Sequence, residues 1–462
     1  LRMSRGLGDV YKRQSEDSTS YIRKGVVYSI DKTTQGLSNI ISKLKNSLQA
    51  DITQVYVGIG GQSIHSVKNM VIKDLPMDAI VSQNMVNELM DSNRNMTYPD
   101  YEIQDAITEE YKVDLQYQND PVGIQASRLE GNFLNILWRR SFYRNLNKSF
   151  DNAGIAIAET YLAPLVMADN VLTEAEKRAG CVLVDLGAET TTVSVYYRDK
   201  LRSIAVIPLG GDNITKDLES LQMEACEAER MKLKYSSAIT DVADIDPTAI
   251  LPIDSNRSVE SRRFIEVVEA RTLEIIENVK SFIPSEYIDK LLGGIIITGG
   301  GSNMTNIEKA FREITGVEKI RIAKFVTLNI NSKDSKPELR HDGTMNTILS
   351  LIARGDMNCA GNPFGNSLFD NQQFNAAFTT GTTNGTTTTQ PNATTPHETE
   401  EERTKREEKE RIAKEEAERI KQEEETRKAK EEEERKKNSP IHRFFGSLKQ
   451  FGRSLVEPEN NE

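Results

Sequence analysis

The chain has few of the residues that mark disulfide-rich, metal-binding or membrane-spanning proteins. It contains three cysteines in 462 residues, Cys181, Cys226 and Cys359, whose spacing fits neither a metal site nor a disulfide framework. Such usage is typical of a reducing cytoplasm. No stretch approaches the roughly 20 apolar residues of a spanning helix, and the first residues lack the apolar core of a signal peptide. The net charge of −11 and the pI of about 5.3 argue against a general nucleic-acid binder.

The first residues also lack a convincing hydrophobic period. The chain begins with Leu1 rather than methionine, and no regular pattern is recognisable before about Tyr21, where a strand-like run to Ile30 begins. We interpret residues 1–14 as foreign or mis-assembled sequence that replaces an N-terminal strand. A disordered tail is the alternative interpretation.

Strands and helices alternate over most of the remaining chain. Residues 32–48 have helical spacing, and residues 55–59 form an apolar run that ends at Gly60 and Gly61. The segment 67–152 has a rhythm of its own, with expected helices at 84–91 and 141–153 and expected strands at 101–107, 110–113 and 128–137. This alternation predicts an α/β protein with more than one sheet and an inserted subdomain.

The most informative stretch is residues 181–195. A buried strand runs into Asp185 and Gly187, followed by small hydroxyl residues that include Thr190 and Thr191, and then a second strand. Such a hairpin presents backbone N–H groups and hydroxyls to an anion, and Asp185 is suited to hold a metal-bound water. The alternative role for Asp185 is to cap an ordinary turn.

A second turn of similar character follows the apolar strand 292–298. It consists of Gly299, Gly300 and Gly301, and the next two residues are suited to cap a helix. Phosphate binding and helix capping both require backbone without Cβ, so these two roles are compatible. Two strands that each end in glycine, far apart in sequence, predict a nucleotide held between two lobes.

Two further pairs support this interpretation. Gly210 and Gly211 end a third strand at 201–208, before an expected helix at 214–221. Glu229 and Lys232 lie on one face of another expected helix at 224–233, three residues apart.

The composition changes after residue 362. Residues 363–398 are rich in Asn and Thr and predict a flexible linker, whereas residues 399–438 carry Glu–Lys and Glu–Arg pairs typical of a single solvated helix. Residues 439–456 predict an amphipathic membrane-targeting helix, because an apolar stripe is flanked by positive charge. The residues are Ile441, Phe444, Phe445, Leu448, Phe451 and Leu455 in the stripe, with Arg443, Lys449 and Arg453 beside it. A helix that binds a partner's groove is the main alternative.

Several of these stretches together resemble the FtsA family of bacterial cell-division proteins, within the actin-like ATPase superfamily. The matching stretches are residues 25–31, 55–61, 185–191, 207–215, 229–232 and 296–301. The resemblance implies a two-lobed α/β fold with an FtsA-type inserted subdomain. Its expected parts are lobe 1 at 15–66, 153–179 and 331–362, the insert at 67–152, the lobe 2 core at 180–232 and 292–330, and a small subdomain of lobe 2 at 233–291.

The resemblance also implies the ligands. ATP with Mg²⁺ is expected to bind the glycine and hydroxyl turns, with Glu229 and Lys232 at the ribose and adenine and Asp185 holding Mg²⁺ through water. No catalytic residue is assigned, and the expected activity is at most that of a weak ATPase serving assembly.

The implied function is structural. A protein of this family self-assembles into filaments, lies on the cytoplasmic side of the cell membrane at the division site, anchors the FtsZ ring there and recruits later division proteins. The FtsZ C-terminal tail is expected to bind residues 233–291, with Arg271 as a candidate contact; the alternative for Arg271 is a solvated helix-face charge. No nucleic-acid partner is expected.

One departure from the family pattern concerns nucleotide binding. The early Asp-x-Gly-Ser/Thr hairpin that forms the first phosphate loop of the superfamily is not recognisable, which predicts weakened nucleotide binding. The alternative function is a metabolic kinase of the same fold, which would need a catalytic carboxylate over a sugar pocket. A chaperone is disfavoured, since a polar linker stands where a peptide-binding β domain is expected.

Overall fold

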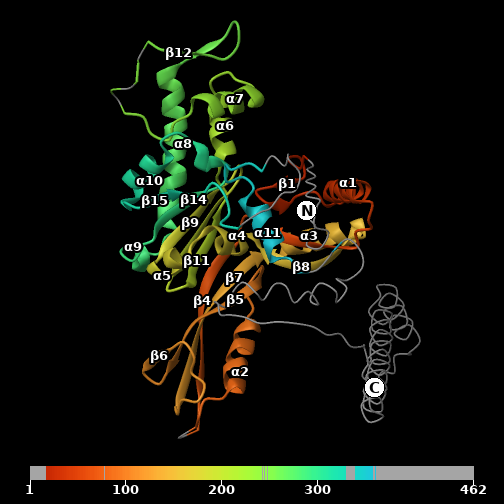
Figure 1. Cartoon of the computed structure of the whole chain (residues 1–462), viewed down its shortest axis with the longest axis vertical. Helices are drawn as coiled ribbons and strands as arrows, with labels where there is room; N and C mark the ends of the chain where they lie inside the picture. The colour runs from red at the N-terminus through yellow and green to blue at the C-terminus, as the bar shows by residue number, and fades with distance from the viewer. Residues whose placement is uncertain are drawn as a thin grey trace, which may run out of the picture. The chain divides into compact units, whose positions relative to one another are not determined.

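The computed structural model describes residues 17–356 and 359, apart from 77–78, 242, 244, 247 and 329–338. These residues belong to one compact unit of mixed helices and strands (Figure 1). The α/β class predicted from the sequence is therefore confirmed. The expectations for residues 1–14, for the linker, for the charged helix and for the membrane-targeting helix at 439–456 lie outside the described residues.

The described residues form a nine-stranded sheet in the order β15-β14-β9-β10-β11-β4-β7-β5-β6. One half contains β9 (Cys181–Leu186), β10 (Thr191–Tyr197), β11 (Lys200–Ile207), β14 (Gly294–Thr298) and β15 (Ile320–Ile322). Strands β9, β10 and β11 form an antiparallel meander, while β14 runs parallel to both β9 and β15. The strands β9 and β14 read as unbroken apolar runs because both faces of this part of the sheet are covered.

Helices of the second lobe cover that half of the sheet. They are α6 (Gly211–Glu219), α7 (Ala225–Tyr235), α8 (Ser261–Ser281), α9 (Ser285–Ile288) and α10 (Ile307–Thr315). A hairpin of β12 (Ile250–Pro252) and β13 (Ser258–Glu260) precedes α8. Helices α8 and α10 run beside β14 and β15 (Figure 1), and Phe264, Val268 and Phe311 are fully buried in the shared core.

The first lobe is built around two parallel strands, β3 (Gln54–Ile59) and β8 (Ala156–Leu162). The helices around them are α1 (Ile30–Leu48), α3 (Arg140–Ala153), α4 (Ala163–Val171) and α11 (Asn346–Arg354), whereas α5 (Glu174–Ala179) packs against β10. The strand-like run expected at 21–30 is wrong in extent, because only β1 (Ile22–Arg23) and β2 (Val26–Val27) pair. Gly25 turns the chain between them at φ +70°, where a Cβ would lie 2.7 Å from Gly61 Cα.

The inserted segment has its own small core. It contains β4 (His65–Asp74), α2 (Gln83–Arg94), β5 (Tyr101–Val113), β6 (Gln116–Gln118) and β7 (Arg128–Arg139). Helix α2 lies beside these strands (Figure 1), and its Leu89 belongs to one buried cluster with Leu129 and Phe133 of β7. The two strands expected at 101–107 and 110–113 are one strand with two irregularities in its pairing, which interrupt the alternation. Strand β4 was not predicted, since none of its residues is fully buried. Helix α3 packs against α1, with Phe150 in the first lobe's core.

The insert meets the second lobe where β4 lies beside β11. Strand β4 pairs with β11 at a single position, His65 opposite Ala205. Beside it, Arg202 Nη1 lies 3.3 Å from Glu109 Oε1, and both side chains are less than one tenth exposed. A buried pair of this kind costs desolvation to form, but the loss of one partner leaves an uncompensated charge.

We expect Arg202→Met to destabilise this junction by about 3–5 kcal/mol, because it leaves the Glu109 carboxylate buried without its partner. The double variant Arg202→Met/Glu109→Leu removes both charges and should recover most of that loss. The stability of the single and the double variant is measured by urea unfolding. The signal is the fluorescence of Trp138, which is the only tryptophan in the chain and is 98% buried. Equal midpoints for the single and double variants would contradict the prediction.

Candidate nucleotide-binding site

The candidate site lies where two parallel strands end. In the pairing of β9 with β14, Asp185 stands opposite Thr298, and each strand then enters a glycine turn. Because the carboxyl ends of parallel strands meet at one edge of a sheet, the turn after Asp185 and the turn at residues 299–301 are neighbours. The sequence predicted that these two turns lie close together, and the register of β9 with β14 is the reason that they do.

The two turns touch so closely that they exclude side chains. Gly299 has φ +86° and ψ 173°, a conformation that is essentially restricted to glycine. A Cβ on Gly299 would lie 2.4 Å from Asp185 Oδ1 and 2.5 Å from the Leu186 carbonyl oxygen. A Cβ on Gly210 would lie 2.5 Å from the Ala188 carbonyl oxygen, so the third turn is equally constrained.

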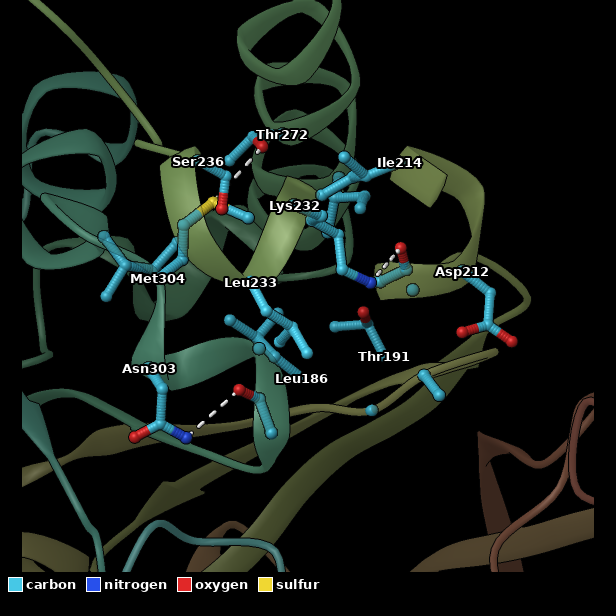
Figure 2. A pocket seen from close by; sticks show the side chains of 18 of the residues that line it. Leu186, Thr191, Asp212, Ile214, Lys232, Leu233, Ser236, Thr272, Asn303 and Met304 are labelled. Carbon is cyan, nitrogen blue, oxygen red and sulfur yellow. Dashed lines mark hydrogen bonds between the residues drawn. The ribbon is translucent and has the colours of Figure 1, made fainter. Parts of the chain in front are cut away.

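A cavity of about 460 Å³ opens beside these turns (Figure 2). Eight of the residues expected at the nucleotide line it: Gly187, Thr191, Gly210, Gly211, Glu229, Lys232, Gly300 and Gly301. Asp185, Thr190 and Gly299 do not line it, although Gly299 contacts Asp185 directly. The structure therefore brings the separate motifs to one place.

Other lining residues carry no recognisable motif. In Figure 2, Asn303 and Met304 lie across the cavity from Lys232 and Asp212. Asn303 Nδ2 donates hydrogen bonds to the carbonyl oxygens of Gly300 and Asp342, at 3.1 and 2.7 Å. No sequence motif marked these residues as part of the site. The same holds for Arg340 and Thr344 and for an apolar wall made by Leu186, Ile214, Leu233, Ile275, Ile276 and Phe311.

The Asp185 carboxylate is half-buried at the end of β9. No hydrogen bond or ion pair reaches this side chain from the part of the chain that the structure describes, and burial raises its pKa to about 6. The two neighbouring threonines hold the turn in different ways. Thr191 Oγ1 donates to the Leu209 carbonyl oxygen at 2.9 Å, whereas Thr190 closes the turn through its carbonyl oxygen, which accepts from Gly187 N at 2.9 Å.

Glu229 and Lys232 form an ion pair, with Lys232 Nζ 2.6 Å from Glu229 Oε2. Thr215 of α6, which the sequence analysis missed, contacts both side chains. The predicted pair therefore belongs to a larger hydrogen-bonded group at the cavity.

Arg271 lies on α8, outside the set of residues that line the cavity. Its Nε and Nη2 atoms bind the two oxygens of Asp217 in α6, at 2.5 and 3.1 Å, and its Nη1 atom pairs with Glu274. The guanidinium is only 26% exposed and joins two helices.

The two lobes also touch beside the cavity. Lys24 N, in the turn between β1 and β2, donates a hydrogen bond to Glu189 Oε2 at 2.6 Å. Glu189 belongs to the turn that follows Asp185, so the turn of one lobe contacts the backbone of the other.

A mixed α/β fold of two lobes, with a cavity between glycine turns and an insert in the first lobe, defines the class of actin-like ATPases. The model of the family described as "Cell division protein FtsA" matches residues 182–340, and that of the "SHS2 domain inserted in FTSA" matches residues 61–137. The chain belongs to the FtsA family of cell-division proteins, as the resemblance implied.

Two relatives establish the family. The cell division protein FtsA of Porphyromonas gingivalis is 31% identical over 68% of this chain and 68% of its own length. That of Neisseria meningitidis serogroup B is 30% identical over 66% of this chain and 79% of its own length. A solved PilM–PilN type IV pilus biogenesis complex has a TM-score of 0.48 and 13% identity, covering 74% of this chain and 89% of that one. That likeness is too distant to bear on function.

The described helices include none with the length and apolarity to cross a membrane.

A pair of glycine variants tests the close approach of the two turns. We expect Gly299→Ala to destabilise the protein well beyond Gly316→Ala. Gly316 also has positive φ, +76°, but nothing lies within 4 Å of its Cβ position, so the substitution costs about 1–2 kcal/mol of backbone strain alone. At Gly299 the clash with Asp185 and Leu186 adds to that strain. Thermal unfolding of the two variants measures the difference, and equal melting temperatures would refute it.

Proposed function

We propose that this FtsA-family protein binds ATP with Mg²⁺ and self-assembles. On this proposal it anchors the FtsZ ring to the inner face of the cytoplasmic membrane and recruits later division proteins. The observation that carries the nucleotide part is the cavity of about 460 Å³ between the glycine turns. Its size falls within the roughly 300–1,000 Å³ of small-molecule sites.

The lining of the cavity suits the parts of a nucleoside triphosphate. Backbone N–H groups of the glycine turns are available to phosphate oxygens, since glycine lets an anion approach the backbone closely. The apolar wall that includes Ile275 and Met304 supports a base, and Glu229 supplies a carboxylate suited to sugar hydroxyls. Any hydrolysis serves assembly, and family membership favours division over the alternative of a metabolic kinase.

Asp185 fits Mg²⁺ through water rather than directly. Among the described residues, no group of three or more His, Cys, Asp or Glu side chains is arranged to hold a metal ion. A single carboxylate without a protein partner matches Mg²⁺, which keeps several waters and takes its other ligands from phosphates. When bound, the ion neutralises phosphate charge beside the turn.

We expect protonation of Asp185 alone to lower the affinity for Mg-ATP about tenfold when the pH is decreased from roughly 7 to 5. The pKa of this carboxyl is raised to about 6 by burial, so the charge that attracts Mg²⁺ is present above that pH and is lost below it. Calorimetry on the wild type and Asp185→Asn measures the effect. The protonation of ATP itself affects both proteins equally, so the readout is the ratio of the wild-type affinity to the Asp185→Asn affinity. A ratio that stays constant with pH would exclude the role of the Asp185 charge in binding Mg-ATP.

The partner contacts are proposed from family membership. The FtsZ C-terminal tail binds residues 233–291, with Arg271 as a candidate contact, and the insert at 67–152 takes part in self-association. Because Arg271 is paired with Asp217, an acidic tail would have to exchange with that carboxylate. The domain boundaries given above remain predictions.

The membrane contact is proposed from the sequence of residues 439–456, which lie outside the described residues. An aromatic apolar stripe with basic flanks is suited to the headgroup boundary of a bilayer. With this tail the protein is a peripheral one on the cytoplasmic side of the membrane at the division site.

Sedimentation with anionic liposomes tests this tail in the full chain. We expect Phe445→Glu to release the protein, because a charge then enters the apolar stripe, whereas Phe445→Leu should still pellet. Raising salt should weaken binding without abolishing it, since each basic residue contributes only about 1 kcal/mol near an anionic surface. Equal pelleting of Phe445→Glu and wild type would move the membrane site elsewhere.

A further inference from the structure

Strand β4 has an open edge along most of its length. The strand lies between β11 and β7 in the sheet, and it pairs with β7 from end to end. On its other side it pairs with β11 only at His65, and no other described strand pairs with residues 67–74 there. In Figure 1 the strands of the insert project beyond the second lobe.

The backbone at this edge carries groups without a partner strand. Residues of an antiparallel pair alternate between those that exchange backbone bonds with the neighbour and those that do not. Leu75 N donates to the Ser127 carbonyl oxygen at 2.8 Å, and the register from there to His65 is regular, so the odd-numbered residues bond to β7. The N–H and C=O groups that point to the open edge therefore belong to Lys68, Met70, Ile72 and Asp74.

The side chains of the same four residues lie on the sheet face away from α2, because the odd-numbered Asn69 bonds to a side chain of α2. Met70 and Ile72 are 54% and 42% exposed. Proteins usually protect an open edge with a charge, a proline or a bulge. In β4 the outward charges stand at the two ends, Lys68 and Asp74, and the apolar centre has no proline and pairs regularly with β7. The centre of this edge is thus open to a further strand.

The order of the outward residues is complementary to itself. Two copies of β4 that run antiparallel about a twofold axis at Val71 place Lys68 opposite Asp74 and Met70 opposite Ile72. Opposite charges and apolar pairs directly across two strands are both favourable. Moving the axis by one residue in either direction sets a charged residue opposite an apolar one. The sequence of β4 therefore favours a single register with a second copy.

The ion pair that Lys68 already makes is compatible with this register. Lys68 Nζ lies 2.6 Å from Glu286 Oε1, and both side chains are about half exposed. A lysine ammonium has three donors, so it can bind a carboxylate of the second copy as well.

We propose that the open edge of β4, at residues 68–74, pairs with the same edge of a second copy of this chain about a twofold axis. The sheet of one molecule then continues into that of the other. A filament that grows head to tail joins unlike surfaces, whereas this contact joins like surfaces and closes on itself. The inference deepens the proposed self-association, on which its role in assembly rests, because it adds a contact between molecules that run in opposite directions.

A disulfide tests the register in the full chain. One short strand edge buries less than the roughly 1,000 Å² of a stable interface, so the contact is weak in dilute solution and has to be trapped. At the twofold axis the two Val71 Cα atoms would lie about 4.5 Å apart, within the range that a disulfide spans. The background is Cys226→Ser, which removes the exposed native thiol; Cys181 and Cys359 are buried.

The matched control is Val67→Cys, since Val67 lies on the same face and is also half-buried. In the proposed register it is separated from its own copy by eight residues of strand, about 27 Å. We expect Val71→Cys to form disulfide-linked dimers at least about tenfold faster than Val67→Cys, because only the first pair lies within disulfide range. A non-reducing gel measures both rates.

Two further variants in the Val71→Cys background test the edge itself. The N–H of Met70 points away from β7, so Met70→Pro keeps the pairing within the insert but blocks a second strand. It should abolish the disulfide, whereas Met70→Val, which keeps the N–H, should retain it. Asp74→Lys sets a lysine opposite Lys68 of the second copy and should slow the reaction about tenfold. Fluorescence of Trp138 verifies that each variant is folded.

The possible results separate this contact from filament assembly. Equal rates for Val71→Cys and Val67→Cys would overturn the inference, as would a disulfide that persists in folded Met70→Pro. The crosslinking needs no nucleotide, so either result would leave the proposed assembly with Mg-ATP, measured by sedimentation of filaments, unaffected. A disulfide specific to Val71→Cys without such sedimentation would support the contact and refute the proposed filament.

Discussion

The candidate site depends on the parallel pairing of β9 with β14. Asp185 stands opposite Thr298, so both strands end at the same edge of the sheet. Each strand then continues into a turn, and the two turns lie against each other with no side chain between them. The contact of Gly299 with Asp185 and Leu186 fixes how closely these turns approach. A shift of one residue in this register would reverse the faces of β14 and separate the turns. The placement of Asp185 and the side of the cavity formed by Gly187, Gly300 and Gly301 follow from this register.

The sequence predicted those parts of the structure whose signal is local. Apolar runs followed by glycine identified β9 and β14, and residues 299–301 were correctly associated with the turn after Asp185. Strand β4 was missed because its side chains are nowhere fully buried, so no hydrophobic alternation marks it. Thr215, Asn303 and Asp342 were missed for another reason. Thr215 contacts two lining residues because α6 packs on α7, and Asn303 of η2 (Gly300–Asn303) meets Asp342 from the segment before α11 at the cavity; no local pattern in one sequence encodes either arrangement.

Charged side chains in this protein often join segments that are distant in sequence. Arg202 and Glu109 connect β11 to the insert, and Arg271 connects α8 to Asp217 of α6. A sequence alone cannot distinguish such a charge from one that faces solvent or a partner, because the pairing is set by tertiary structure. Pairs that are buried or partly buried in this way hold geometry more than they add stability, since desolvation offsets much of their attraction.

The junction between β4 and β11 has a mechanical consequence. The backbone contacts that join β4 to β11 are confined to a short stretch, where His65 pairs with Ala205, Val206 N donates to the Ile64 carbonyl oxygen at 3.0 Å and Ile204 N donates to Ser66 Oγ at 2.9 Å. Away from this stretch, side chains hold the insert to the second lobe: the buried Arg202–Glu109 pair, Lys200 on the Glu109 carbonyl oxygen, and the Lys68–Glu286 pair. The last pair is about half exposed on both sides and is therefore weakened by salt. Tension along the sheet is thus carried by the backbone, whereas resistance to twisting depends on these side chains.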